Sequence, residues 1–76
     1  MKELVELVAK ALVDRPEEVS VAEVDAEDEI VVELSVAESD LGKVIGKQGR
    51  TIRAMRTLVE AGGEKNGQRY YLDIIE

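Results

Sequence analysis

The sequence predicts an α+β domain in the order α-β-β-α-α-β, with three helices packed on one face of a three-stranded mixed sheet. Apolar residues recur with a helical period over residues 2–13 and 50–61. Three shorter runs, residues 19–25, 30–37 and 69–75, are rich in β-branched or aromatic residues. The last two runs are joined through helices, and such a crossover makes adjacent strands parallel. At 76 residues the chain is expected to form a single domain, residues 1–76.

The first helix is predicted over residues 2–13. It should end before Pro16, because the residue that precedes a proline avoids the helical conformation. The i, i+3, i+4, i+7, i+8 spacing predicts a buried stripe made of Leu4, Leu7, Val8, Ala11 and Leu12.

An antiparallel hairpin is predicted next. Residues 19–25 should form an edge strand, and Val24 is out of phase with Val19 and Val21, which a bulge near Ala22–Glu23 would explain. The acidic run DAEDE, residues 25–29, lacks the ligand spacing and the glycine of a calcium loop, so we interpret it as part of a solvated turn. In the second strand, Ile30, Val32, Leu34 and Val36 share one face.

Two helices and a strand complete the predicted domain. A short helix carrying Leu41, Val44 and Ile45 should be capped by Ser39 or Asp40 and stopped by Gly46. The next helix is predicted from Arg50 to about Ala61, with Gly62–Gly63 as its end signal. Its core side is expected to consist of Ile52, Met55, Leu58 and Val59. In the final strand, Tyr70, Leu72 and Ile74 should point inward.

Positive charge is concentrated in one segment of this acidic chain. The net charge is −7, yet residues 42–59 contain no Asp or Glu and carry Lys43, Lys47, Arg50, Arg53 and Arg56. The other 58 residues hold 5 basic and 17 acidic side chains, a charge of −12. An anion at a protein surface mostly senses charges within about 8–10 Å, so the local segment decides what binds there. At about 100° per residue, the three arginines lie within an arc of about 120° on their helix.

The loop GKQG, residues 46–49, joins the two helices. Gly46 is placed where a positive φ is wanted, and Gly49 precedes a helix whose free N–H groups and positive dipole end point at the loop. Lys47 adds a cation at the tip and Gln48 a neutral hydrogen-bonding group. Capping glycines and solvated arginines are each ordinary, but together in an acid-free segment they indicate a surface for a phosphodiester backbone. Gly42, inside the first of these helices, is interpreted as room for a neighbouring strand or helix.

The segment GKVIGKQGRTI, residues 42–52, resembles the KH-domain signature V/I-I-G-x-x-G-x-x-I, which lies across a helix–turn–helix. The element order matches the type II (bacterial) KH fold. The length and the opening ELVELVAKALVDRPEEV, residues 3–19, are similar to those of the small bacterial single-KH-domain RNA-binding proteins of the KhpA type.

The resemblance implies that the chain clamps about four nucleotides of single-stranded RNA. The backbone clamp would be Gly46, Lys47, Gln48 and Gly49. The apolar positions of the motif would be Val44, Ile45 and Ile52, and Ile45 would also form part of the groove floor. The residues that flank the strand would be Lys43, Arg50 and Arg53. An RNA chaperone or post-transcriptional regulator is implied. The residues themselves predict a cytoplasmic location and no catalysis, cofactor or metal, because the chain has neither Cys nor His.

The resemblance also implies pairing, either as a homodimer or with a larger KH-containing RNA-binding protein. The chain has no Phe or Trp, so a stacking platform is not expected, and one copy should bind weakly. Two sites on one RNA would then supply useful affinity. The sheet face with Val31, Tyr71 and Ile75 is either a self-association surface or simply a partly exposed face.

Other functions are compatible with parts of this sequence. A KH-like module that binds protein is one alternative, although both loop glycines and Lys47 are kept. Single-stranded DNA is another, since the motif does not distinguish it from RNA. A nucleotide phosphate loop is disfavoured, because only three residues separate Gly42 from Gly46 and Gln48 replaces Ser or Thr. The apolar N-terminal segment is unlike a signal peptide, because it is interrupted by Glu3, Glu6 and Lys10. No apolar run in the sequence is long enough to span a membrane, so a soluble location is expected.

Overall fold

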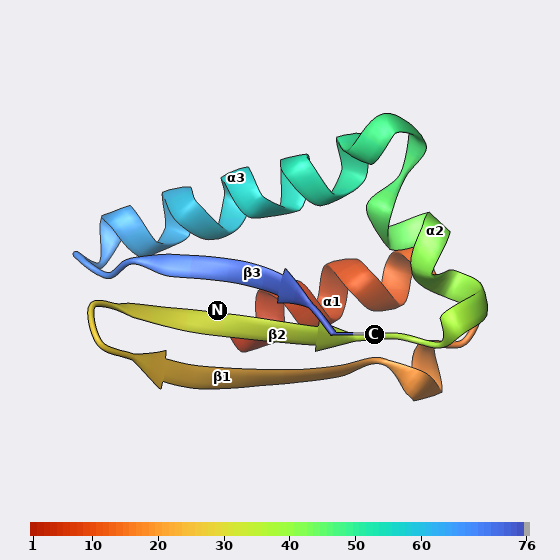
Figure 1. Cartoon of the computed structure of the whole chain (residues 1–76), viewed down its shortest axis with the longest axis horizontal. Coiled ribbons are helices and arrows are strands. Elements are labelled where there is room, and N and C mark those ends of the chain that lie inside the picture. Colours follow the sequence, from red (N-terminus) through yellow and green to blue (C-terminus); the bar gives the residue numbers. More distant parts are fainter. Residues whose placement is uncertain (76) are drawn as a thin grey trace.

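The computed structural model describes residues 1–75 and has the predicted order of elements (Figure 1). Short 3-10 turns η1, η2 and η3 separate some of the main elements. The bounds along the chain are α1 Lys2–Leu12, η1 Pro16–Glu18, β1 Ser20–Ala26, β2 Glu29–Ser35, η2 Glu38–Asp40, α2 Leu41–Ile45, η3 Lys47–Gly49, α3 Arg50–Lys65 and β3 Tyr70–Ile74.

The sheet has the order β1-β2-β3, with β1 antiparallel and β3 parallel to β2. Helix α1 packs against β1 and β2, while α3 packs along β3 in the opposite direction (Figure 1). The buried side chains form one cluster, which comprises Val5, Ala9, Val21, Val32, Leu34, Val44, Ile52, Met55, Val59 and Leu72. The predicted α+β class and the mixed sheet with three helices are therefore confirmed. Within residues 1–75, no helix combines the length and the apolar character needed to cross a bilayer.

The predicted bulge in the first strand is wrong. Residues of β1 pair one-to-one with β2 over the whole strand, from Ser20 with Ser35 to Ala26 with Glu29. Val24 is out of phase because it lies on the open face of the sheet, where it is 44% exposed, while Val21 points into the core. An edge strand with one face in water can carry such a valine without changing its register.

The buried stripe predicted for α1 is wrong except at Val8, which is partly buried against the core. The helix buries Val5 and Ala9, whereas Leu4, Leu7 and Leu12 are exposed. Apolar residues cover more than one side of this helix, so two overlapping stripes satisfy the same period. The small side chains of Val5 and Ala9 allow the helix axis to approach the sheet closely, and the longer leucines then lie at the margin of the contact.

Helix α3 is longer than predicted, because Gly62 and Gly63 lie inside it and it continues to Lys65. A Cβ at Gly63 would lie 2.5 Å from the carbonyl oxygen of Gln68 and 2.6 Å from the ring of Tyr70. The glycine thus gives the returning chain room to pack against the helix. The turn itself is made at Gly67, where φ is +68°. Leu58, which was expected in the core, is 52% exposed, while Ile52, Met55 and Val59 are buried.

The sequence suggested Ser39 or Asp40 as the cap of α2. Neither side chain forms a capping hydrogen bond with the start of this helix. The Asp40 carboxylate is 1% exposed and accepts the backbone N–H of Asp14 at 3.1 Å and that of Arg15 at 3.0 Å. These two bonds attach the chain after α1 to the first turn of α2. A buried carboxylate of this kind is stable only while its partners are kept.

We expect Asp40→Ala to lower the free energy of unfolding by about 2–3 kcal/mol, because two backbone N–H groups would lose their acceptor. Urea denaturation followed by circular dichroism measures the change. Glu38→Ala is the matched control, since it removes an exposed carboxylate from the same turn and should change the stability by less than about 0.5 kcal/mol. Equal denaturation midpoints for the two variants would contradict the structural role of Asp40.

Candidate nucleic-acid interface

The chain turns from α2 into α3 through Gly46–Gly49, and three of these residues have a positive φ. The values are 78° at Gly46, 57° at Gln48 and 72° at Gly49. The N–H of Gly46 donates to the carbonyl of Gly42 at 2.8 Å, and the N–H of Gly49 donates to that of Gly46 at 3.0 Å. The loop therefore has a defined shape, with the side chains of Lys47 and Gln48 exposed at its tip.

The two glycines of the loop are required for different reasons. A Cβ at Gly46 would overlap the side chain of Thr51, lying 2.6 Å from its Cβ, so this position needs both the positive φ and the empty space. At Gly49 the nearest atom, on Ile52, would be 4.0 Å away, so only the left-handed backbone demands glycine there. The positive φ predicted for Gly46 is confirmed.

Arg50 and Arg53 bend back toward the loop from the first turn of α3. Nη2 of Arg53 donates to the backbone carbonyl of Gln48 at 3.0 Å, and Nη2 of Arg50 lies 3.4 Å from Oε1 of Gln48. Gln48 is the residue with the unusual left-handed backbone, so the arginines stabilise the loop where it is most strained. Each guanidinium has five N–H donors, which leaves donors for an anion beside the loop.

Arg56 continues the same stripe but has a different environment. It is partly buried, and its Nε donates to the carbonyl of Leu72 at 3.0 Å. The carbonyl of Arg69 and the N–H of Ile75 form hydrogen bonds with β2. In a parallel pair of strands, every second residue directs its N–H and C=O toward the partner strand. Leu72 is one of the residues in between, so its carbonyl faces the free edge of β3. The guanidinium carbon also lies 5.1 Å from the centre of the Tyr71 ring, a cation–π contact. Arg56 thus joins α3 to the outer edge of the sheet.

Lys43 is placed on the exposed side of α2 and is already paired. Its Nζ donates to Oδ2 of Asp14 at 2.7 Å and lies 3.9 Å from Oδ1 of Asp40. The hydrogen bond that Lys43 donates to Asp14, together with the negative charge of Asp14, raises the pKa of Lys43 above the ordinary lysine value. The ammonium group therefore stays charged at neutral pH, but it points toward Asp14 rather than standing free beside the loop.

The outer surface of α2 is bare and partly apolar. Among residues 1–75, no atom lies within 4 Å of the place where a Cβ of Gly42 would be, so the strand or helix expected against this glycine is not there. Ile45 is 37% exposed, in agreement with a residue shared between core and surface. A cleft of about 370 Å³ lies nearby, between the start of α2 and the end of β3, and it is lined by Val36, Glu38, Leu41 and Ile75.

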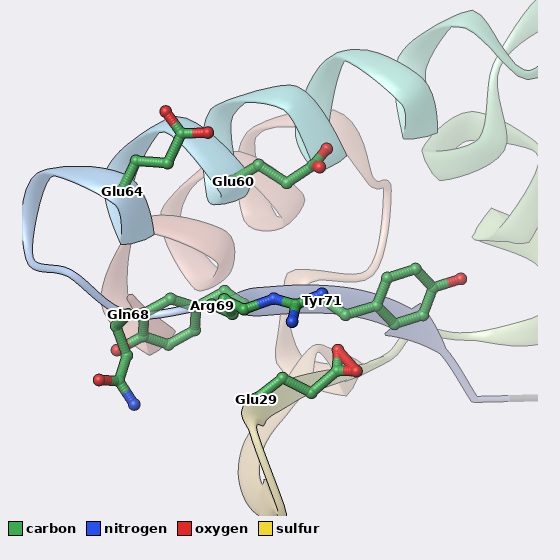
Figure 2. A pocket seen from close by; sticks show the side chains of 7 residues that line it. Glu29, Glu60, Glu64, Gln68, Arg69 and Tyr71 are labelled. Atoms are coloured by element: carbon green, nitrogen blue, oxygen red, sulfur yellow. The ribbon is translucent and has the colours of Figure 1, made fainter.

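A second cleft, of about 230 Å³, lies at the other end of β3, against the last turns of α3. Figure 2 shows Glu60 and Glu64 extending from α3 above it, with Glu29 below and the Tyr71 ring at one side. The remaining lining residues are Gln68, Arg69 and Tyr70. The bridge from Arg56 to Leu72 lies between the two clefts, because Leu72 is in the middle of β3.

Three residues of β3 and its end were not predicted to border the candidate interface, although Tyr71 and Ile75 were assigned to the exposed sheet face. Tyr71, Leu72 and Ile75 reach the interface only because β3 returns parallel to β2 and leaves its outer edge open beside α3. These residues could have been predicted from the parallel crossover, because it places the free edge of the last strand next to the helix that carries the arginines. No side-chain motif in residues 69–75 marks it.

Comparisons with known proteins agree with this architecture. The family model described as "KhpA/KhpB, KH domain" matches residues 2–74. A protein named RNA-binding protein KhpA from Clostridium perfringens (strain 13 / Type A) is 53% identical over 75 residues, 99% of this chain and 100% of the relative. A protein of the same name from Aquifex aeolicus (strain VF5) is 51% identical over 76 residues, 100% of this chain and 96% of the relative.

A third relative, also named RNA-binding protein KhpA, comes from Halalkalibacterium halodurans and is 53% identical over 76 residues, 100% of each chain. No solved structure matches the chain significantly. The resemblance to KH domains that was based on residues 42–52 is confirmed, and the family match extends over nearly the whole chain. With its two-glycine loop between α2 and α3 and its type II order of elements, the chain belongs to the KhpA/KhpB KH-domain family.

Proposed function

We propose that this protein binds single-stranded RNA by holding the sugar–phosphate backbone at Gly46–Gly49. The observation that carries the proposal is the loop itself, which has three positive φ angles, two exposed polar side chains at its tip and the N-terminus of a 16-residue helix behind it. The names of the relatives, which describe them as RNA-binding proteins, support the same function. An RNA chaperone or post-transcriptional regulator in the cytoplasm, acting without catalysis, remains our prediction for its role.

Phosphate groups would be held by charge and by backbone donors together. The N–H of Arg50 already donates to the carbonyl of Lys47. The N–H groups just after it have no partner within α3, and the helix dipole places positive potential at the loop. Lys47, Arg50 and Arg53 add three cations around that point, all exposed. Lys43 would join them only by leaving Asp14, and an exposed ion pair of that kind is weak.

The bases would lie against α2 and the end of β3. Gly42 leaves the backbone of α2 open, Ile45 adds an exposed apolar side chain, and the cleft beside Leu41 and Ile75 extends the surface. Both aromatic residues are on β3, and Tyr70 is packed at Gly63. Van der Waals contact and hydrogen bonds to base edges would therefore dominate, which favours weak binding with loose sequence preference.

Two alternatives fit part of these observations. A protein-binding KH-like module would explain the acidic surface but not the exposed cation and the glycines that the loop retains. Single-stranded DNA would satisfy the phosphate-binding groups equally well, and only contacts to the 2′-OH separate the two nucleic acids.

We also propose that two KH domains act together, as a homodimer or in a pair with a larger KH-containing protein. A single clamp without stacking is weak, and a second site on the same RNA raises the effective affinity. Leu4 and Leu58 are exposed and line a narrow cleft between α1 and α3, and Leu7 is exposed one turn from Leu4 on α1; these three residues are called the α1–α3 apolar patch. This patch suits pairing better than the sheet face with Val31, Tyr71 and Ile75, because Arg56 lies over Tyr71.

The double variant Lys47→Asp, Gln48→Asp should lose at least about tenfold in affinity for a short single-stranded RNA, because carboxylates at the tip repel phosphate. Fluorescence anisotropy of a labelled RNA measures the loss, and a DNA of the same sequence shows whether the sugar matters. The matched control is Lys65→Asp, Asn66→Asp, which makes the same charge change at the other end of α3. If both folded variants weaken binding equally, net charge rather than the loop is responsible.

The affinity of the wild-type protein should depend only modestly on salt. If two or three phosphates are neutralised, the logarithm of the binding constant should fall with a slope of about −1.4 to −2 against the logarithm of salt concentration. Titrations over a series of potassium chloride concentrations give this slope. An affinity that does not change with salt would favour the protein-binding alternative.

Sedimentation velocity over a concentration series should show self-association of the wild type, and Leu7→Glu should shift it toward the monomer, because a charge in an apolar contact is strongly disfavoured. Leu7 is 69% exposed, so the substitution should leave the fold intact. Val31→Glu on the sheet face is the comparison. If it disrupts the association and Leu7→Glu does not, the sheet face is the contact surface.

A further inference from the structure

The sign of the charge reverses along one face of α3. The positive part of this face consists of Arg50, Arg53 and Arg56. Glu60 lies one turn beyond Arg56, and Glu64 lies one turn beyond Glu60. At about 100° per residue, all five side chains leave the helix within an arc of about 120°. The stripe is therefore continuous, with its positive half next to the loop and its negative half at the far end.

Arg56 and the negative half of this stripe face the free edge of β3, while Arg50 and Arg53 bend toward the loop. Arg56 donates to the carbonyl of Leu72, while Glu60 and Glu64 line the cleft against Tyr70 and Tyr71 (Figure 2). Because α3 and β3 run in opposite directions (Figure 1), moving away from the loop along the helix leads from the Ile75 end of the strand to its Tyr70 end. A strand of RNA that followed this edge past Arg56 would reach the carboxylates.

The lining of the cleft at the far end is negative even after its one cation is counted. Glu29, Glu60 and Glu64 contribute three negative charges to the cleft lining and Arg69 one positive charge, a sum of −2. Within residues 1–75 no salt bridge joins Arg56 to Glu60, although they are four residues apart, because Arg56 is turned toward the edge of β3. The carboxylate of Glu60 is thus not neutralised by its helical neighbour.

The reversal is abrupt on the scale of electrostatic screening. Four residues of helix span about 6 Å, so Glu60 lies within the distance of about 8–10 Å over which charges act at physiological salt. A phosphate beside Arg53 or Arg56 would gain from the arginines, and the next phosphate along the edge would meet Glu60 and then Glu64.

We propose that Glu60 and Glu64, with Glu29, set the end of the RNA-binding track. Phosphate is attracted between the loop and Arg56 and is excluded beyond it, so a longer RNA must leave the surface of the protein there. These residues determine the length of RNA that one domain holds. The inference rests on the proposed function and adds to it a limit that the loop alone does not supply.

The test compares the wild type with Glu60→Gln, Glu64→Gln on oligouridylates of about four and about ten nucleotides, the first being the length that a KH clamp holds. The variant should bind the longer RNA about twofold to fivefold more tightly than the wild type, as expected for exposed charges, and the shorter one equally. Its salt dependence on the longer RNA should steepen by about 0.7 for each added phosphate. Backbone amide shifts at residues 68–71 should respond to the longer RNA in the variant only.

The control is Glu3→Gln, Glu17→Gln, which removes the same two charges from exposed positions on α1 and η1, away from the edge of β3. Equal gains for the two double variants, or an equal gain on both RNA lengths, would overturn the boundary and indicate an effect of net charge. Unchanged binding of the longer RNA to Glu60→Gln, Glu64→Gln would overturn it as well. If the wild type binds neither RNA, the proposed function itself is wrong, and the boundary is rejected with it.

Discussion

The buried carboxylate of Asp40 fixes the start of α2 by accepting the N–H groups of Asp14 and Arg15. Helix α2 has only five residues, and a helix so short is not stable by itself. Its position depends on these two bonds and on the burial of Val44. The loop begins where α2 ends, so the direction in which the loop faces follows from a contact with the end of α1. The site is thus assembled from segments more than twenty residues apart in the chain.

Much of this architecture could be predicted because it depends on local pattern. The order of elements, the parallel last strand and the loop all follow from period, turn chemistry and the right-handed crossover. The two loop glycines were identifiable for a similar reason, since a helix that must end and restart within four residues needs positive φ angles there. Lys47 and Gln48 are exposed as expected because a tip between two helices has nothing to pack against. These features are decided by neighbours in sequence.

Other features depend on contacts between distant segments, and the sequence pattern could not decide them. The apolar residues of α1 allow two overlapping stripes, and only the fit of Val5 and Ala9 against the sheet selects one. Gly63 resembles a helix stop, yet the returning chain before β3 packs against it and keeps it helical. From the sequence, Arg56 lies on the same face of its helix as the exposed Arg50 and Arg53. It became a bridge because β3, paired with β2, leaves the carbonyl of Leu72 unpaired at its outer edge.

An acidic protein can present a surface for RNA when its positive groups are held in place and its negative groups limit where RNA lies. Arg53 and Arg56 each donate to a backbone carbonyl, so their positions are set before any ligand arrives and less side-chain freedom is lost on binding. The negative charges outside residues 42–59 then act mainly on RNA that strays from this surface, because screening confines each charge to its surroundings. A uniformly basic domain would attract RNA to every face. If RNA is held at the loop as proposed, the small number of cations and their fixed order along α3 favour one orientation of the strand.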